Sequence, residues 1–212
     1  MKRMLLLVGV FAFPAAVSFA QPAGEKPDLA KARTIVDQVC AACHGVDGNS
    51  PTPANPSLAA LPAEYISLQL AHFKTGIRAN AIMLGMSAAL TEADMKALGT
   101  YYSQQKPKGL AAKDAALVDA GRSLYRTGDT AAGIPACSAC HGPAGAGIPK
   151  SYPRLAGQHG DYTVAQLKAF RTGERGADKG GKDLNGRIMA TIAARMTDAQ
   201  MRAVAEFTQG LR

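Results

Sequence analysis

Two short motifs in the sequence combine residue types and a spacing that can bind a cofactor or a metal. Each motif places two cysteines three positions apart, directly followed by histidine and glycine, and the chain has four cysteines in all. The motif residues are Cys40, Cys43 and His44 in the first copy, and Cys137, Cys140 and His141 in the second. Such a motif can form a redox disulfide, contribute to a zinc site, or hold haem through two thioether bonds. These chemistries imply unrelated functions, so the remaining sequence must decide between them.

Zinc and a redox dithiol both fit the surrounding sequence poorly. A zinc ribbon needs its two cysteine pairs about fifteen to twenty residues apart, whereas Cys40 and Cys137 are 97 positions apart. The adjacent Cys43 and His44 would also crowd a tetrahedral metal. Thioredoxin-like motifs lie beside a βαβ sheet, and no alternating run of apolar residues predicts strands here.

Covalently bound haem explains every residue of the motif. Cysteines at positions i and i+3 share one side of a helical turn, where their sulfurs can bond two neighbouring vinyl groups of the ring. The histidine that follows then supplies an axial nitrogen ligand to the iron, and Gly45 and Gly142 let the chain turn beside the ring. We therefore predict two haem c groups, attached through Cys40, Cys43, Cys137 and Cys140 and ligated by His44 and His141.

The motifs belong to a longer internal repeat, which predicts two related domains. The stretch NPSLAALPAEYISLQLAHFKTG (55–76) aligns 97 residues later with YPRLAGQHGDYTVAQLKAFRTG (152–173). Nine extra residues enter the second copy between positions 172 and 189, and eight more, including TGDTAAG, precede its cysteines. Insertions of this kind belong in loops. We predict an N-terminal domain at 21–106, a linker with proline and glycine at 107–116, and a C-terminal domain at 117–212.

Both domains are predicted to be all-α. Capping-box spacing precedes the last helix of each copy, and apolar residues recur along that helix every three positions. Pro62 starts a middle helix that ends near Gly76, and residues 28–40 form the first helix. The capping pairs are Thr91 with Asp94 and Thr197 with Gln200, and the apolar faces are Met95, Leu98 and Tyr101, and Met201, Val204 and Phe207. Units this small bury little core of their own, which agrees with a large apolar cofactor at the centre of each.

The sixth ligand of each iron decides between a closed electron carrier and an open site that binds small molecules. Met83 and Met189 occupy matching positions in segments with a weak helical pattern, so we expect them on loops that reach over the ring. Thioether sulfur favours ferrous iron and gives a raised reduction potential. We predict Met83 and Met189 as the second axial ligands, with simple packing as the alternative role.

The other methionines and two histidines are weaker candidates. Met95 and Met201 lie on the apolar stripes of the last helices, where methionine usually fills the core. Met86 and Met196 have no methionine partner in the other copy, and we interpret both as core residues. His72 and His159 are not equivalent by alignment, so we expect ordinary surface or helix-face positions rather than a bis-histidine site. These candidates are Met86, Met95, Met196, Met201, His72 and His159.

The N-terminus has the pattern of a secretory signal. Lys2 and Arg3 precede an apolar run that is too short to span a bilayer, and Ser18 and Ala20 supply small residues before a cleavage site. We predict a signal peptide at 1–20 and export to the periplasm. A retained membrane anchor is the alternative, although no second apolar run of spanning length follows.

Charge is distributed unevenly along the chain, whose formal net charge is +8. Residues 111–212 carry 14 basic and 9 acidic side chains, whereas residues 21–110 carry 8 and 7. Such asymmetry can steer a charged partner. The basic stretch 171–187 either docks on an acidic surface or forms a solvated loop. Nucleic-acid binding is not indicated, since the chain is exported and has no Trp to stack on bases.

The whole mature chain resembles the dihaem cytochrome c4 group, in which two class I cytochrome c domains lie in tandem. The resemblance rests on the paired CxxCH motifs, the stretch YPRLAGQHGDYTVAQL, a loop methionine and a closing helix that ends near Tyr or Phe. It implies axial ligation by Met83 and Met189, in agreement with the choice above. The first copy has NPSLAAL in place of YPRLAGQ, so Arg154 has no charged counterpart and Gln158 has no polar one. If propionate and interdomain hydrogen bonds use these positions, the second domain alone supplies them.

The resemblance implies an electron shuttle rather than an enzyme. Its expected donor is a quinol-oxidising complex, and its expected acceptor is a terminal oxidase, such as the cbb3 type, or a reductase. Docking would be transient, with peripheral membrane association possible and no nucleic acid involved. The alternatives are a dihaem enzyme of the peroxidase or thiosulfate-oxidising kind, and an electron-transfer subunit of a larger respiratory complex.

Overall fold

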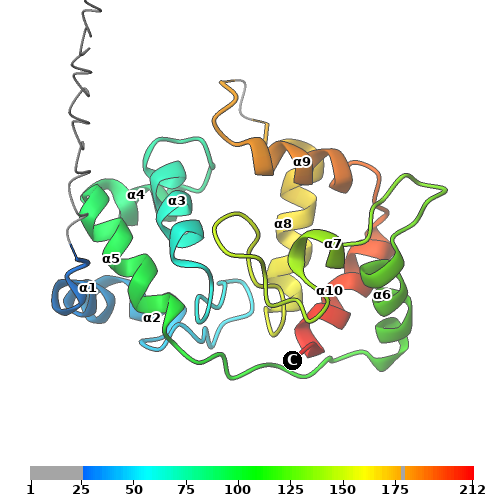
Figure 1. The fold of residues 1–212 in the computed structure, drawn as a ribbon, viewed down its shortest axis with the longest axis horizontal. Helices are drawn as coiled ribbons and strands as arrows, with labels where there is room; N and C mark the ends of the chain where they lie inside the picture. The colour runs from blue at the N-terminus through cyan, green and yellow to red at the C-terminus, as the bar shows by residue number, and fades with distance from the viewer. Residues whose placement is uncertain (1–25, 178–179) are drawn as a thin grey trace, which may run out of the picture.

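The computed structural model describes residues 26–177 and 180–212, which form two helical lobes side by side (Figure 1). The predicted signal peptide at 1–20 lies outside the described residues. The first lobe contains α1 (Leu29–Ile35), the π-helical turn η1 (Val36–Cys40), α2 (Ala41–His44), α3 (Ala63–Lys74), α4 (Ala81–Ala88) and α5 (Glu92–Ser103). The second contains α6 (Ala115–Thr127), α7 (Ser138–His141), α8 (Gly160–Thr172), α9 (Leu184–Ala193) and α10 (Asp198–Gly210). Among the described residues β structure is limited to two isolated bridges, so the all-α prediction is confirmed.

The two lobes repeat one packing pattern. In the first, α5 packs on α1 and α3, and α3 packs on α4; in the second, α10 packs on α6 and α8, and α8 packs on α9. Each lobe has its own apolar core, which contains Met95 and Leu98 in the first and Met201, Val204 and Phe207 in the second. The predicted apolar faces are therefore confirmed, except that Tyr102 rather than Tyr101 is fully buried.

Both last helices begin at the predicted capping boxes. The Thr91 hydroxyl accepts a hydrogen bond from the Asp94 amide at 3.1 Å, and the Asp94 carboxylate accepts one from the Thr91 amide at 3.0 Å. Thr197 and Gln200 make the same reciprocal pair at the start of α10. These bonds satisfy amide groups that a helix start leaves without partners. Pro62 occupies the N-cap position of α3 without a side-chain hydrogen bond, and α3 ends at Lys74, two residues before Gly76, as predicted.

Two glycines allow the long helices to cross closely. A Cβ at Gly121 of α6 would collide with the Ala203 carbonyl of α10, and a Cβ at Gly99 of α5 would collide with the Ala63 carbonyl of α3. Any larger residue would push the helix pairs apart. In contrast, Gly85 of α4 has open space around its Cα.

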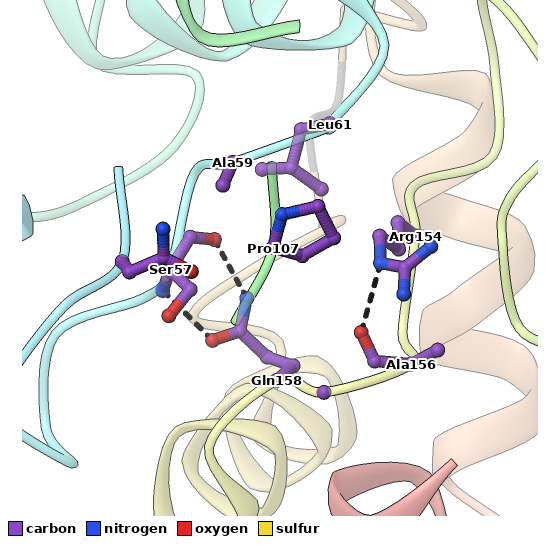
Figure 2. A pocket seen from close by; sticks show the side chains of 9 residues that line it. Ser57, Ala59, Leu61, Pro107, Arg154, Ala156 and Gln158 are labelled. Carbon is purple, nitrogen blue, oxygen red and sulfur yellow. Dashed lines mark hydrogen bonds between the residues drawn. The ribbon is translucent and has the colours of Figure 1, made fainter. Parts of the chain in front are cut away.

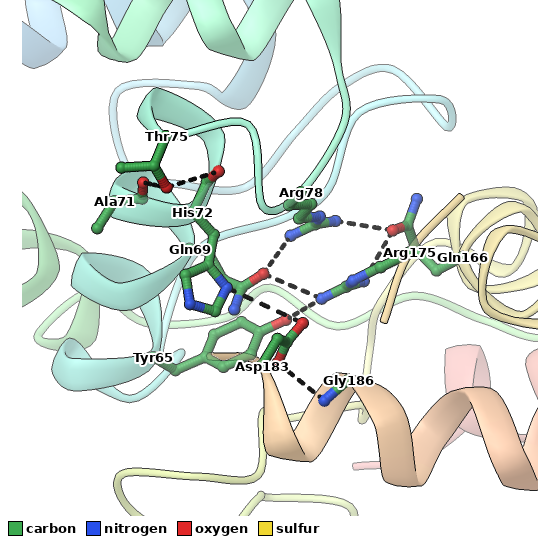
Figure 3. A network of polar contacts seen from close by, with 10 residues as sticks. All are labelled: Tyr65, Gln69, Ala71, His72, Thr75, Arg78, Gln166, Arg175, Asp183 and Gly186. Carbon is green, nitrogen blue, oxygen red and sulfur yellow. Dashed lines mark hydrogen bonds and ion pairs between the residues drawn. The ribbon is translucent and has the colours of Figure 1, made fainter. Parts of the chain in front are cut away.

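A nearly symmetrical polar network joins the lobes, and Figure 3 shows part of it. Arg78 of the first lobe donates to Gln69 at 2.8 Å within its own lobe, and to Gln166 at 2.7 Å and the Tyr162 hydroxyl at 2.9 Å across the interface. Arg175 of the second lobe donates to Gln166 at 2.7 Å, and to Gln69 at 3.1 Å and the Tyr65 hydroxyl at 3.0 Å across it. The two halves of the network correspond under the repeat, so the lobes are related by a pseudo-two-fold axis.

A second contact between the lobes has no such symmetry. Gln158 accepts from the Ser57 amide and donates to the Ser57 carbonyl, both at 2.9 Å, as Figure 2 shows. The neighbouring His159 bonds the Ser50 carbonyl through Nε2 at 2.9 Å. The second lobe thus supplies these side chains and the first supplies only backbone groups, as expected from the loss of Gln158 in the first copy. Ser57 and Gln158 line a small pocket at this contact, together with Arg154, which donates to the Ala156 carbonyl.

The two insertions of the second copy lie between helices. The eight extra residues form the turn between α6 and α7, closed by the Asp129–Ile134 bridge, and the nine extra residues fall between α8 and the start of α9. In the part of the chain that the structure describes, no helix has the length and hydropathy needed to cross a membrane.

Candidate functional site

Each cysteine-histidine motif lies on a short helix that ends at its histidine. The first motif runs from the last residue of η1 through α2, and the second runs from the N-cap of α7 through that helix. Gly45 and Gly142 follow with φ of 75° and 81°, a backbone region that favours glycine, and so end both helices. The cysteines of each motif are therefore one helical turn apart, as the haem prediction requires.

Both histidines are buried and held in one orientation. His44 and His141 are 9% and 6% exposed. The Nδ1 atom of His44 lies 2.9 Å from the Pro56 carbonyl, and that of His141 lies 2.9 Å from the Pro153 carbonyl. A carbonyl oxygen accepts a hydrogen bond only from a protonated Nδ1. The Nε2 atom of each neutral ring therefore has its lone pair available to bind a metal. Histidines that bind metals in proteins are generally oriented by a second bond of this kind.

Burial also keeps these imidazoles neutral. It lowers the pKa of His44 and of His141 below the ordinary value, and the hydrogen bond to the proline carbonyl opposes that shift without cancelling it. A neutral imidazole is the form that ligates iron. Both sites therefore present a preoriented nitrogen ligand.

The cysteines of the two motifs form no disulfide. Burial raises the pKa of Cys40, and it raises the pKa of Cys137 to about 11. Redox-active dithiols instead need a lowered pKa on the attacking cysteine. Within residues 26–177 and 180–212, no group of three or more His, Cys, Asp or Glu side chains is arranged to hold a metal ion.

The structure places Met83 and Met189 on helices rather than on loops. Met83 is in α4 and Met189 is in α9, so the expected loop position is wrong. Asn80 and Asp183 cap these helices, and their side chains supply the start signals that apolar periodicity alone did not reveal. Both methionines are half-buried, and Met189 packs against the same core cluster as Cys137. Met83 is not part of the corresponding first cluster, which does include Cys40.

The remaining methionines divide as predicted, with one exception. Met95, Met196 and Met201 are 4%, 5% and 0% exposed, which confirms them as core residues. Met86 is 47% exposed on α4, so its assignment to the core is wrong. It follows Met83 by three positions and lies on the outer side of that short helix.

His72 and His159 are not surface residues. They are 4% and 6% exposed, and both lie where the lobes meet. His159 bonds Ser50 of the other lobe, and the Nδ1 atom of His72 is 4.0 Å from Asp183 of the other lobe. We predicted ordinary surface or helix-face positions because the two histidines do not align in the repeat. Each histidine instead contacts the other lobe, and neither contact has a symmetrical copy.

Sequence reasoning also missed Arg78 and Arg175. Each is 8% exposed and lies over a phenylalanine ring, Phe73 at 4.5 Å and Phe170 at 4.4 Å from the ring centre. The arginines stand 97 positions apart, the same offset that relates Tyr65 to Tyr162 and Gln69 to Gln166. Polar residues that recur at the repeat offset, on α3 and α8 and in the turns that follow these helices, were the available signal for this interface.

These features define a class of protein: two tandem helical domains, each with a covalent attachment site for one haem c. Each domain offers a pair of thiols one turn apart, a buried imidazole with a free Nε2, and a half-buried methionine on a neighbouring helix. The donor set of thiols, imidazole and thioether fits haem c. It does not fit structural zinc, which needs four ligands around one point.

Comparison with known proteins gives the particular family. The cytochrome c family model matches residues 29–106 and 118–212. Cytochrome c4 of Thiocapsa roseopersicina is 45% identical over 176 residues, which cover 82% of this chain and 87% of that protein. The thiosulfate dehydrogenase electron acceptor of Thiomonas intermedia (strain K12) is 44% identical over 171 residues, which cover 79% of this chain and 76% of that protein.

A solved structure agrees with these relatives. Reduced recombinant cytochrome c4 from Pseudomonas stutzeri superposes with a TM-score of 0.80 at 36% sequence identity, and the match covers 88% of this chain and 100% of that one. The chain belongs to the dihaem cytochrome c4 group of the cytochrome c family and carries two covalently bound haem c groups.

Proposed function

We propose that the chain is a periplasmic electron shuttle in which both haems have six ligands. In this proposal Cys40 and Cys43 attach the first haem, and His44 and Met83 ligate its iron. Cys137 and Cys140 attach the second, and His141 and Met189 ligate its iron. When bound, each haem supplies a one-electron couple.

The observation that carries the proposal is the matched pair of histidine hydrogen bonds. His44 and His141 are buried at equivalent positions, and each donates from Nδ1 to a proline carbonyl twelve residues later, at 2.9 Å. The protein thus fixes the axial nitrogen in both domains by the same means. A histidine held in the same way in both domains suits two equivalent electron-transfer sites, whereas chemistry on a substrate would need one iron with an open position.

A redox titration of the purified protein with spectral detection tests the proposal. We expect two one-electron steps, low-spin spectra in both oxidation states, and a methionine-to-iron charge-transfer band in the far-red spectrum of the ferric form. High-spin iron in either domain, or peroxidase turnover at ordinary enzyme rates, would contradict the shuttle function.

The helices that carry the methionines also provide surfaces for docking. Ile82, Leu84 and Met86 of α4 are 68%, 47% and 47% exposed, and Leu184 and Ile188 of α9 are 61% and 49% exposed. The sequence of α4 contains no charged residue, whereas α9 includes the exposed Arg187. Small apolar surfaces near the cofactor suit brief encounters between redox proteins. We infer that the second domain meets the more acidic partner.

The donor and the acceptor are proposed from the family. A quinol-oxidising complex is the expected donor and a terminal oxidase, such as the cbb3 type, is the expected acceptor. Stopped-flow mixing with each purified partner tests this assignment. Transfer should be fast and should slow with added salt, because the more basic domain attracts an acidic partner.

Acceptance of electrons from a thiosulfate dehydrogenase is a second candidate function. It is favoured by the 44% identity to the thiosulfate dehydrogenase electron acceptor of Thiomonas intermedia. The test mixes the oxidised protein with such a dehydrogenase and thiosulfate. Reduction of both haems only when enzyme and substrate are present together would support this role, and reduction by thiosulfate alone would instead indicate an enzyme.

A further inference from the structure

Asp183 lies where the interdomain contact meets the helix that carries Met189. Asp183 is 8% exposed, and its Oδ1 atom accepts a hydrogen bond at 2.8 Å from the Gly186 amide in the first turn of α9. Its Oδ2 atom lies 4.0 Å from Nδ1 of His72, which belongs to α3 of the other domain. Figure 3 shows the side chain between these two neighbours. One carboxylate therefore caps α9 and faces the first domain.

The first turn of α9 is tightly packed against the interface. A Cβ at Gly186 would collide with the Asp183 carboxylate, and a Cβ at Gly176 would collide with the Gly186 carbonyl. Gly176 directly follows Arg175, which bonds Tyr65 and Gln69 of the first domain. The charge of Asp183 is also among the causes that raise the pKa of Arg175. Close contacts therefore connect the residue that follows Arg175 to the first turn of α9.

The first domain has a different arrangement at the matching helix. Asn80 caps α4, and its neutral side chain accepts directly from the Met83 amide at 2.8 Å. Asn80 follows Arg78 by two positions, whereas Asp183 follows Arg175 by eight and belongs to the segment enlarged in the second copy. The charged cap is thus a feature of the second domain, added by the insertion.

We propose that Asp183 is a positioning residue that couples the interdomain interface to Met189. Through the cap and the contact with His72, a side chain of the first domain helps to hold the axial methionine of the second haem. The inference rests on the proposed ligation by Met189. It predicts that the two haems differ in how firmly they keep their methionine, although their ligands are the same.

Competition by imidazole for the ferric iron measures how firmly each methionine is held. The holoprotein should bind imidazole in two phases, one for each haem. The phase that changes in the variant Met189→Ala is assigned to the second haem. We expect Asp183→Ala to tighten imidazole binding at that haem about fivefold, the effect of losing a typical N-cap. His72→Gln should tighten the same phase at least twofold and leave the phase of the first haem, in its own domain, unchanged.

A double-mutant cycle separates this coupling from a merely local cap. His72→Gln should have no further effect in the Asp183→Ala background, because the carboxylate through which it acts is gone. Additive effects of the two changes would overturn the proposal. So would an effect of His72→Gln that is confined to the first haem. Asn80→Ala should tighten only the first phase, and Glu64→Gln, on an exposed position of α3, should change neither.

Hydrogen exchange gives a readout that does not depend on the identity of the ligand. Amides of residues 184–193 should exchange faster in His72→Gln, and those of residues 81–88 should not. If Met189→Ala leaves both imidazole phases intact, the ligand assignment is wrong even where the exchange result shows coupling to α9. If exchange in 184–193 is unchanged, the coupling is wrong even where Met189 is the ligand.

Discussion

At the scale of single residues, the two methionine pairs differ in what surrounds them. Met83 and Met189 are half-buried on short helices, whereas Met95 and Met201 lie within the apolar cores. A half-buried thioether can leave its contacts and bond an iron atom. A core thioether cannot do so without opening a cavity.

This difference predicts opposite results for the two pairs. Met83→Ala or Met189→Ala should each remove about half of the charge-transfer band and lower one reduction potential. Met95→Ala or Met201→Ala should keep the full band and destabilise the protein by about 2–5 kcal/mol, the usual cost of truncating a buried methionine. Absorption spectra and denaturant unfolding measure both effects, and the reverse pattern would show that the ligands were wrongly chosen.

The capping boxes give a residue-scale prediction about pH. Hydrogen bonds from Lys31 and then from Thr91 lower the pKa of Asp94 to about 2. Since this pKa lies below that of the unfolded chain, the stabilisation is complete above about pH 4 and is lost as the pH falls toward about 2. Lys31 is largely exposed, so screening by solvent limits the contribution to roughly 1 kcal/mol.

The matched position in the second domain supplies the control. Asp94→Ala should cost about 1 kcal/mol at neutral pH and clearly less at about pH 3. Gln200→Ala, in the uncharged capping box of α10, should cost a similar amount of stability at both pH values. Urea unfolding of both variants against the parent protein measures the two losses, and equal pH dependence of the two would contradict the assignment.

At the scale of elements, the crossings of the long helices depend on glycine. Gly121→Ala places a methyl group against the Ala203 carbonyl, so α6 and α10 must separate. We expect a loss of about 1–3 kcal/mol, the usual cost of overpacking. Gly85→Ala, at a position of α4 where a Cβ meets no other atom, should instead stabilise the protein by up to about 1 kcal/mol, because alanine favours the helical backbone. Thermal unfolding of the two variants distinguishes these signs.

Much of this architecture follows from the sequence, for identifiable reasons. The attachment residues, the capping boxes and the apolar faces are local patterns, and the repeat presents each of them twice. The helical setting of Met83 and Met189 was missed because the start signals are the polar side chains of Asn80 and Asp183 rather than apolar periodicity. The burial of His72 and His159 depends on contacts between residues about one hundred positions apart, which no local pattern contains.

At the scale of the whole molecule, two buried arginines bond across the contact between the domains. Each arginine bonds side chains of both domains and shares the acceptors Gln69 and Gln166 with the other. Removing either guanidinium takes away one of the two donors of each glutamine, and the arginine donor of one tyrosine hydroxyl in the other domain. Hydrogen bonds to charged groups contribute about 1.5–3 kcal/mol each to stability.

We therefore expect Arg78→Ala and Arg175→Ala each to destabilise the protein by about 2 kcal/mol or more. Because each glutamine keeps one arginine donor in a single variant and loses both in the double variant, the double variant should lose more than the sum of the single losses. It should also show a larger radius of gyration by small-angle scattering. Arg202→Ala, at an exposed position of α10, should change neither quantity, and strictly additive losses would show that the two arginines act independently.

The pseudo-two-fold network determines how the contact between the domains responds to dilution. A surface whose arginine, glutamine and tyrosine pair with copies of themselves is also able to join two separate single-domain chains into a homodimer. Such a dimer would fall apart as its concentration dropped. The connection between α5 and α6 makes the same encounter intramolecular, with an effective concentration set by its length rather than by the amount of protein in solution. The two haems therefore stay neighbours however few copies of the molecule are present.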